Sequence, residues 1–267
     1  MAPQQPPTQQ PPPVQRVRLR YTKRGRLRFT SHRDISRVFE RGVRRAALPV
    51  AYSSGFNPHP RLSYAGAAPT GAASEAEYLE IALAAVCDPA QLKDALDDAM
   101  PPGLDVVDAV VASAGTLAER LQASRWQVQL PGASAAVVQQ CVAAFLASDT
   151  VEVSRVTKRG LRTFDSRAAV VQLAVVPVDA DREGPDTAGA DTGPAGMPCV
   201  ILEMVVRHGE PSVRPDDVLA GLRAVGGPDA SAAPVATRLA QGPLDPRDGT
   251  VGDPLALDRD TPGGRLN

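Results

Sequence analysis

The chain has 267 residues, of which 43% are hydrophobic, and its formal net charge is −1, so that it is long and apolar enough to fold as one or two domains. The three scattered cysteines (Cys87, Cys141 and Cys199) form no CxxC or Cys/His cluster. This pattern argues against a zinc site or an iron–sulfur cluster held by this chain and fits a reducing compartment. Because neither a signal-peptide pattern nor an apolar run of about 18 residues is present, we expect a cytoplasmic protein without a membrane segment.

The small net charge hides a strong asymmetry. Between Arg16 and Arg45 there are twelve Lys or Arg residues against Asp34 and Glu40, a local charge of +10, so the rest of the chain sums to −11. A basic segment of this kind indicates an anionic partner. An RNA backbone is the natural ligand, and a nucleotide-like small molecule is the alternative.

The first elements in chain order follow a Pro/Gln-rich tail at 1–13, which we expect to be disordered. Alternating apolar residues predict a strand over 16–21, followed by a turn over 23–26 and a continuation of the strand pattern over 27–29. A helix follows, with Ser31 as its N-cap and Asp34 completing a capping box. Its apolar face would pack on the core, while Arg33, Arg37, Arg41, Arg44 and Arg45 form a ridge.

The remaining pattern predicts two similar domains. An irregular loop over 55–61 precedes strands at 62–65 and 78–83, a helix at 88–100 and an extended segment at 104–111. The order β-α-β-β-α-β is the ferredoxin-like pattern, here over 14–115. A second α+β unit over 124–240 is read from strands at 126–130, 151–156, 169–176 and 200–206 and helices at 135–146 and 214–222, with a polar turn after 156. We thus expect an α+β fold of two ferredoxin-like (βαββαβ-type) units, with a disordered insertion at 180–197 and a disordered tail at 241–267.

The candidate site residues gather in the basic segment. His32 and His59 are candidates for acid/base chemistry or ligand hydrogen bonding, although His32 can equally help cap its helix and His59 can pack in a turn. Phe56 can stack on a base or plug the core beneath its loop. Part of the ridge can also be a self-paired, solvated helix face, through Asp34 with Arg37 and Glu40 with Arg44. The full set of predicted ligand- or RNA-binding residues is Arg28, Ser31, His32, Arg33, Arg37, Arg41, Arg44, Arg45, Ser53, Gly55, Phe56, Asn57, His59, Arg61 and Glu77.

Several of these residues lie in motifs that resemble a known family. The runs GRLRFTSHRD at 25–34 and LPVAYSSGFNPHPRLS at 48–63, with the pattern of Gly71, Ser74, Glu75, Glu77 and Tyr78, closely resemble the radical-SAM-linked domain of unknown function DUF2344 over about 16–225. Members occur alone or fused behind a radical SAM domain. The resemblance implies a radical SAM enzyme as partner, which would carry a [4Fe-4S] cluster and S-adenosylmethionine. This chain lacks CxxxCxxC and resembles the stand-alone form, so we expect it to bind no cofactor itself.

Three hypotheses about function follow. The first is a non-catalytic accessory protein that binds RNA through the basic helix and loop and presents it to a radical SAM enzyme. The second is an RNA-processing or RNA-modifying enzyme, for example a metal-independent endoribonuclease, that uses His32 or His59. The third is a protein–protein adaptor whose arginine ridge docks an acidic partner. We expect the non-catalytic role.

Overall fold

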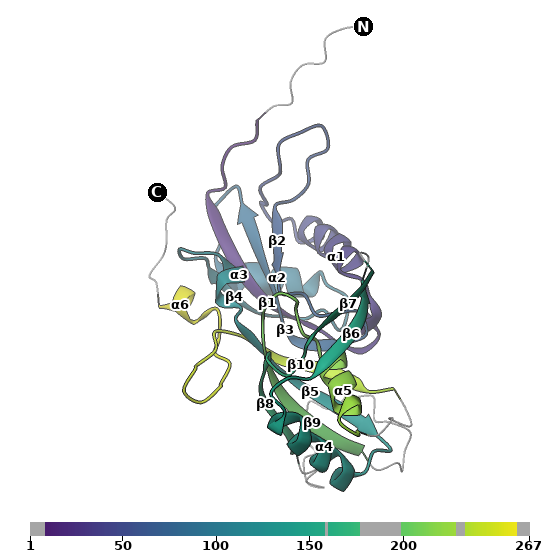
Figure 1. Ribbon diagram of the computed structural model, residues 1–267. Coiled ribbons are helices and arrows are strands. Elements are labelled where there is room, and N and C mark those ends of the chain that lie inside the picture. The colour runs from purple at the N-terminus through teal and green to yellow at the C-terminus, as the bar shows by residue number, and fades with distance from the viewer. Residues whose placement is uncertain (1–8, 158–159, 177–198, 228–232, 261–267) are drawn as a thin grey trace, which may run out of the picture. The chain divides into compact units, whose positions relative to one another are not determined.

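The computed structural model describes residues 9–157, 160–176, 199–227 and 233–260. The chain divides into two compact units with mixed helices and strands (Figure 1). Unit 1 comprises residues 1–70, 76–119 and 255–267, and unit 2 comprises residues 71–75 and 120–254. The predicted insertion at 180–197 lies outside the described residues, as do residues 1–8 of the predicted N-terminal tail. Residues 9–13 form no helix or strand.

Unit 1 is built on strands in the order β4-β1-β3, with β2 pairing antiparallel to β3. The chain order of strands and long helices is β-α-β-β-α-β, as the sequence predicts. The elements are β1 (Gln15–Lys23), the 3-10 helix η1 (Gly25–Phe29), α1 (His32–Arg45), β2 (Leu62–Ala65), β3 (Ala73–Leu83), α2 (Pro89–Asp98), β4 (Val106–Val111), α3 (Leu117–Arg120) at the boundary, and α6 (Ala256–Arg259) near the C-terminus.

The packing of the unit 1 core determines on which face of the sheet the arginines of β1 and of α1 lie. Val17, Leu19 and Tyr21 of β1 are buried in one cluster with Phe39 of α1, and the Tyr21 and Phe39 rings meet at 4.6 Å between centroids. Because side chains alternate along a strand, the arginines of β1 lie on the face of the sheet opposite α1. The arginines of the strand and those of the helix therefore do not form one patch.

Unit 2 has strands in the order β10-β5-β9-β8, all antiparallel, and the first residues of β3 pair parallel to β10. In both units the first strand lies between the last and the third strand of the sheet. A two-stranded hairpin, β6–β7, is separate from the unit 2 sheet. The elements are β5 (Ala123–Pro131), α4 (Ala135–Ala147), β6 (Glu152–Thr157), β7 (Gly160–Asp165), β8 (Val170–Val176), β9 (Cys199–Arg207), α5 (Pro215–Ala224) and β10 (Val235–Gly242).

Two local predictions are wrong. Residues 27–29 do not continue a strand but belong to η1, because Gly25 turns the chain with a left-handed φ of 54° and Thr30 N–H bonds back to the Leu27 carbonyl. The segment after residue 156 is not a polar turn, since β7 pairs with β6 there. Its alternating pattern is short, and only Phe164 on it is a buried apolar residue.

The predicted disordered tail from residue 241 onward is also wrong over 241–260. These residues include the end of β10, a bridge between Leu244 and Val251, and α6. Leu255 is fully buried and Asp258 is 3% exposed. Composition concealed this order because α6 has no apolar stripe: Asp258 bonds to Arg18 and Ser113, Arg259 pairs with Asp108, and Leu255 alone is a fully buried apolar residue of the segment. Residues 261–267 lie outside the described residues.

Candidate functional site

Helix α1 begins as the sequence predicts. Ser31 is its N-cap, and its Oγ accepts a hydrogen bond from the Asp34 N–H at 3.3 Å and donates to the Asp34 carboxylate at 2.7 Å. Ile35, Phe39, Gly42 and Val43 form the buried face of the helix. The 3.6-residue period then places the arginines on the solvent side.

The arginine ridge, defined as Arg33, Arg37, Arg41, Arg44 and Arg45, is exposed along the whole of α1. Arg37 pairs with Asp34 at 3.4 Å, but both side chains are more than half exposed, so this pair neutralises the ridge only weakly. Arg45 donates to the Ala99 carbonyl at 3.1 Å. Among the described residues, Arg33, Arg41 and Arg44 have no ion-pair or hydrogen-bond partner for their side chains, and the expected pair between Glu40 and Arg44 does not form.

His32 lies at the first position of α1 and is exposed. Its ring stands edge-on to Tyr64 of β2, with 4.9 Å between centroids and 89° between the ring planes. Burial raises the pKa of Tyr64 well above its ordinary value, so its hydroxyl stays protonated near neutral pH. The imidazole is thus accessible, whereas the hydroxyl of the neighbouring Tyr64 is buried.

The second part of the candidate site is a closed loop, residues 53–59. Ser53 N–H donates to the His59 carbonyl at 2.9 Å, and His59 N–H donates to Ser53 Oγ at 3.0 Å. Gly55 adopts a φ of 128° within this loop, a conformation suited to glycine. Phe56 is 70% exposed, so it does not plug the core. Asn57 and His59 are also exposed.

Three predicted residues around these elements differ in accessibility. Arg61 is half-buried, and its backbone N–H bonds to the Ala51 carbonyl. Arg28 is half-buried too, and its guanidinium lies 4.7 Å from the centroid of the Phe29 ring. Phe29, which the sequence pattern assigned to a strand, is 61% exposed. An exposed aromatic cannot be recognised from sequence alone when it continues an apolar alternation.

Glu77 is not part of this surface. It is 2% exposed, and its carboxylate accepts a hydrogen bond from the Ala68 N–H at 3.1 Å. The buried Lys23 ammonium donates to the carbonyls of Ala68 and Pro69 at 3.2 and 3.1 Å. Lys23 and Glu77 thus hold the segment before β3 from both sides of its backbone, which is a structural role and not one in ligand contact.

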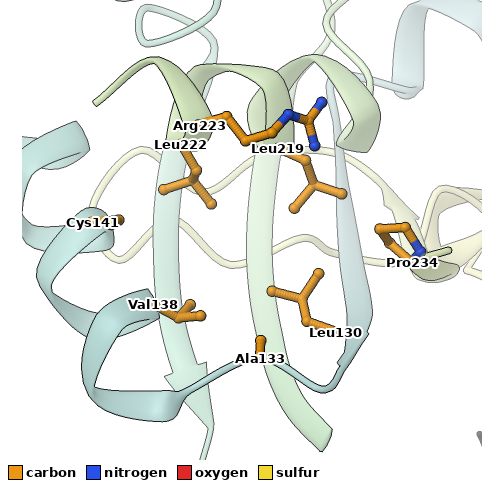
Figure 2. A pocket seen from close by; sticks show the side chains of 8 residues that line it. All are labelled: Leu130, Ala133, Val138, Cys141, Leu219, Leu222, Arg223 and Pro234. Carbon is orange, nitrogen blue, oxygen red and sulfur yellow. The ribbon is translucent and has the colours of Figure 1, made fainter. Parts of the chain in front are cut away.

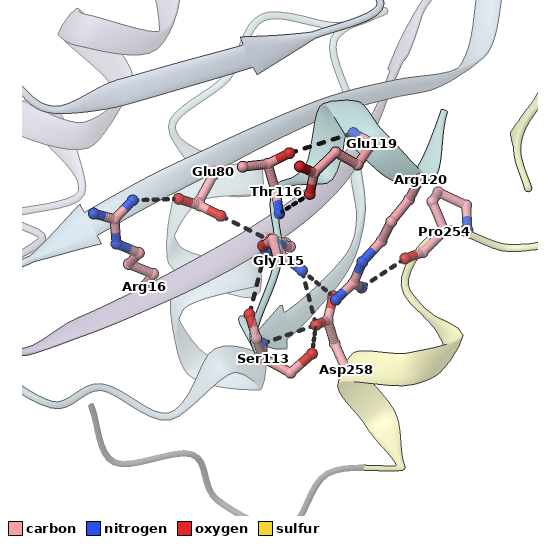
Figure 3. A network of polar contacts seen from close by, with 10 residues as sticks. Arg16, Glu80, Ser113, Gly115, Thr116, Glu119, Arg120, Pro254 and Asp258 are labelled. Atoms are coloured by element: carbon pink, nitrogen blue, oxygen red, sulfur yellow. Dashed lines mark hydrogen bonds and ion pairs between the residues drawn. The ribbon is translucent and has the colours of Figure 1, made fainter. Parts of the chain in front are cut away.

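Two of the three arginines of β1, Arg16 and Arg18, are paired with carboxylates. Arg16 pairs with Glu80 at 2.7 Å, and the 1%-exposed Arg18 pairs with Glu80 at 3.0 Å and with both oxygens of Asp258 at 2.9 and 3.1 Å. Figure 3 shows Asp258 also accepting from the N–H and hydroxyl of Ser113, at 2.8 and 2.6 Å. Burial tends to raise the pKa of Asp258, but the bonds from Ser113 and Arg18 outweigh it, and the net effect is a lowered pKa.

Each unit also contains a cavity. In unit 1, a concave volume of about 500 Å³ lies beside the Arg18 network and is lined by Arg16, Arg18, Ser63–Ala65, Glu80 and 112–118. In unit 2, a largely apolar cavity has a volume of about 20 Å³. The side chains that line it are drawn in Figure 2: Leu130, Ala133, Val138, Cys141, Leu219, Leu222, Arg223 and Pro234. This cavity has room for about one water molecule and is a packing gap rather than a ligand site.

Metal-binding clusters and membrane-spanning helices are both missing from the part of the chain that the structure describes. There, no three His, Cys, Asp or Glu side chains gather closely enough to hold a metal ion. Over the same residues no helix is both long and apolar enough to cross a membrane.

Comparison with known proteins gives a family. Residues 16–215 match the model of the family described as an uncharacterized protein conserved in bacteria, DUF2344. The chain belongs to this family. No curated protein matches this DUF2344 member. A crystal structure of an unknown protein from Galdieria sulphuraria is 14% identical, with 79% of this chain and 91% of that chain covered, but its TM-score of 0.22 is too low to support an argument.

Proposed function

We propose that this DUF2344 member binds RNA through the arginine ridge of α1 and the 53–59 loop. The observation that carries the proposal is the set of exposed arginines without partners among the described residues, Arg33, Arg41 and Arg44. Planar guanidinium groups match phosphate oxygens with paired hydrogen bonds. Elsewhere in the basic segment, Arg18 and Lys23 are buried and satisfied, so they add little to the outer positive surface, whereas all five arginines of the ridge are exposed.

The RNA would be presented to a radical SAM enzyme in the cytoplasm. This part of the proposal rests on the resemblance of the 25–34 and 48–63 motifs to the radical-SAM-linked family. The [4Fe-4S] cluster and S-adenosylmethionine would belong to that partner. The SGFNPHPR segment at 54–61, most of which lies in the closed loop, is then a recognition element and not a core plug.

We also assign both units to the ferredoxin-like class. Support comes from the sheet of unit 1, where β4-β1-β3 continues through the β2–β3 pair, and from β10-β5-β9-β8 in unit 2. When the strands of each sheet are numbered in chain order and the β6–β7 hairpin is treated as an insertion, both sheets have the strand order 4-1-3-2. The basic helix α1 then occupies the first helical position of its unit.

The binding proposal is tested with a charge-reversal pair and a matched control. R41E/R44E replaces two ridge arginines, and R125E/R207E makes the same change in net charge at exposed arginines of unit 2. Binding of a fluorescent RNA is measured by anisotropy on the full chain. We expect R41E/R44E to weaken binding by at least about tenfold and R125E/R207E to leave it nearly unchanged. Equal effects of the two variants would contradict a ridge-specific site.

An enzymatic role is the second candidate, and the contact between His32 and Tyr64 favours it. An exposed imidazole at the start of a basic helix is placed to move a proton on a bound RNA. His32→Ala would then abolish RNA cleavage or modification while binding stays within about twofold. If the wild-type protein leaves cellular RNA chemically unchanged, the accessory role remains. Selective capture of an acidic protein with no RNA binding would instead support the adaptor.

A further inference from the structure

The phenylalanines of the chain fall into two groups. Phe39, Phe145 and Phe164 are buried at 0%, 0% and 8% exposure, as is usual for large apolar side chains. Phe29 and Phe56 are 61% and 70% exposed. Both exposed rings lie in unit 1 and flank the arginine ridge in the chain, one before α1 and the other in the loop after it.

Phe29 is held in an outward position. It ends η1 immediately before Thr30 and the N-cap of α1, and the Arg28 guanidinium covers its ring at 4.7 Å. This contact orients the ring without burying it. A flat aromatic surface is therefore available at the end of the ridge where Arg33 lies.

Phe56 is presented by a loop that is closed at its base. The two hydrogen bonds between Ser53 and His59 fix the ends of the 53–59 segment, and Phe56 lies between them. In Figure 1 the loop rises above β2, and α1 lies beside that strand, with Tyr64 of β2 against His32. The loop that carries the exposed Phe56 thus directly precedes the strand that contacts the start of α1.

The spacing along α1 suits one extended strand of nucleic acid. Arg33, Arg37 and Arg41 recur every four residues, a rise of about 6 Å per step. Successive phosphates of one strand are similarly spaced whether the strand is single or paired, so the exposed rings, and not this spacing, distinguish the two kinds of RNA. A single strand leaves its base faces free for aromatic rings, whereas a duplex stacks its bases inside.

We infer that the RNA bound by unit 1 is single-stranded, with its phosphates along the arginine ridge and unpaired bases stacked on Phe29 and Phe56. The inference rests on the proposed RNA binding and adds the class of RNA. Stacking on a ring does not depend on the identity of the base, so recognition by this surface is tolerant of sequence.

The test compares one unstructured RNA oligonucleotide with the same strand annealed to its complement, using the full chain at fixed salt. F29L and F56L keep an apolar side chain but remove the ring, and F29Y and F56Y keep the ring. Leu161→Ala, at a 71%-exposed apolar residue in unit 2, is the matched control. We expect each leucine variant to weaken single-strand binding about tenfold, with duplex binding unchanged and the tyrosine and Leu161→Ala variants close to wild type.

The outcomes separate this inference from the proposed function. If R41E/R44E abolishes RNA binding but the leucine variants bind the single strand as wild type does, base stacking is refuted and RNA binding stands. Duplex affinity equal to or above that for the single strand also overturns the inference. If the wild-type chain binds neither RNA, the proposed function itself fails. Circular dichroism confirms that each variant is folded.

Discussion

Residues of one type have opposite roles within the basic segment. Arg18 and Arg41 are both arginines of unit 1, yet Arg18 is buried between two carboxylates and Arg41 is exposed without a partner among the described residues. Burying a charge is tolerated only when it is paired, so Arg18 contributes to folding. An exposed, unpaired guanidinium remains available to a ligand. A count of the basic residues in a segment therefore overestimates the charge available to a ligand whenever some of those residues are buried and paired, as Arg18 is.

His208 should make the stability of unit 2 depend on pH. Its Nε2 lies 2.7 Å from Ser124 Oγ and its Nδ1 lies 2.8 Å from the Leu121 carbonyl, which suits the neutral ring with Nδ1 protonated. Burial foremost, opposed by the Leu121 bond and aided by the charge of Arg238, lowers the pKa of His208 below 6.5. The native state therefore resists protonation, and this contribution to stability is complete above pH 6.5 and declines as the pH falls toward the lowered native pKa.

The measurement is urea unfolding of wild type and His208→Gln over a pH series across this range. We expect wild type to lose stability between pH 6.5 and the native pKa of His208, and the variant to lose less over the same interval. Parallel pH profiles for the two proteins would show that His208 is not the titrating group.

At the scale of elements, α6 shows how a short segment can complete a distant unit. It follows all of unit 2 in the chain, yet Asp258 reaches Arg18, 240 residues earlier. Without Asp258, Arg18 would keep only Glu80, which it already shares with Arg16, as a carboxylate partner among the described residues, and the Ser113 N–H would lose this acceptor. The N-terminal unit therefore depends on residues encoded at the other end of the chain.

Asp258→Ala should destabilise unit 1 by about 3 kcal/mol, because it removes one partner of a buried ion pair and leaves the Arg18 guanidinium with Glu80, which it shares with Arg16. Hydrogen exchange read at β1 and β4 reports this change locally. Asp260→Ala, at an exposed aspartate two residues on, is the control and should have little effect. If both variants lower protection equally, general loosening of the C-terminal segment explains the result better than the ion pair does.

For the whole molecule, a net charge of −1 coexists with a strongly positive helix. Binding at such a site depends on the local field, since screening at physiological salt limits charge interactions to about 8 Å. The acidic remainder of the chain then reduces non-specific attraction to nucleic acid elsewhere. Charge segregation of this kind favours a defined binding face over general adhesion to polyanions.

The salt dependence of RNA binding should reflect the number of phosphates that the arginine ridge contacts. With about four arginines engaged, the logarithm of the binding constant should fall with the logarithm of salt concentration with a slope of about −3, at about −0.7 per phosphate for a single strand. R41E/R44E should make this slope shallower by at least the contribution of two phosphates, at about 0.7 for each. A slope near zero in the wild type would mean that phosphates are not the main contact.

Much of unit 1 follows from sequence periodicity. The alternation in β1 and the 3.6-residue pattern in α1 each create an apolar face from local order alone, and Ser31 has the chemistry of an N-cap. The arginine ridge and the SGFNPHPR segment can accordingly be recognised in the amino-acid sequence. The same motifs indicate the family, and residues 16–215 match it.

Tertiary structure alone decided which of the predicted site residues face solvent. Periodicity did not indicate that Glu77 is buried against the Ala68 backbone, that Phe29 is exposed, or that the tail beyond residue 241 contains the carboxylate that neutralises Arg18. These features depend on contacts between residues that are far apart in the chain. A local sequence pattern contains no information about such contacts or their free energy. The sequence by itself determined the basic helix and its cap, while burial and long-range charge pairing selected the part of the basic segment that remains free to bind.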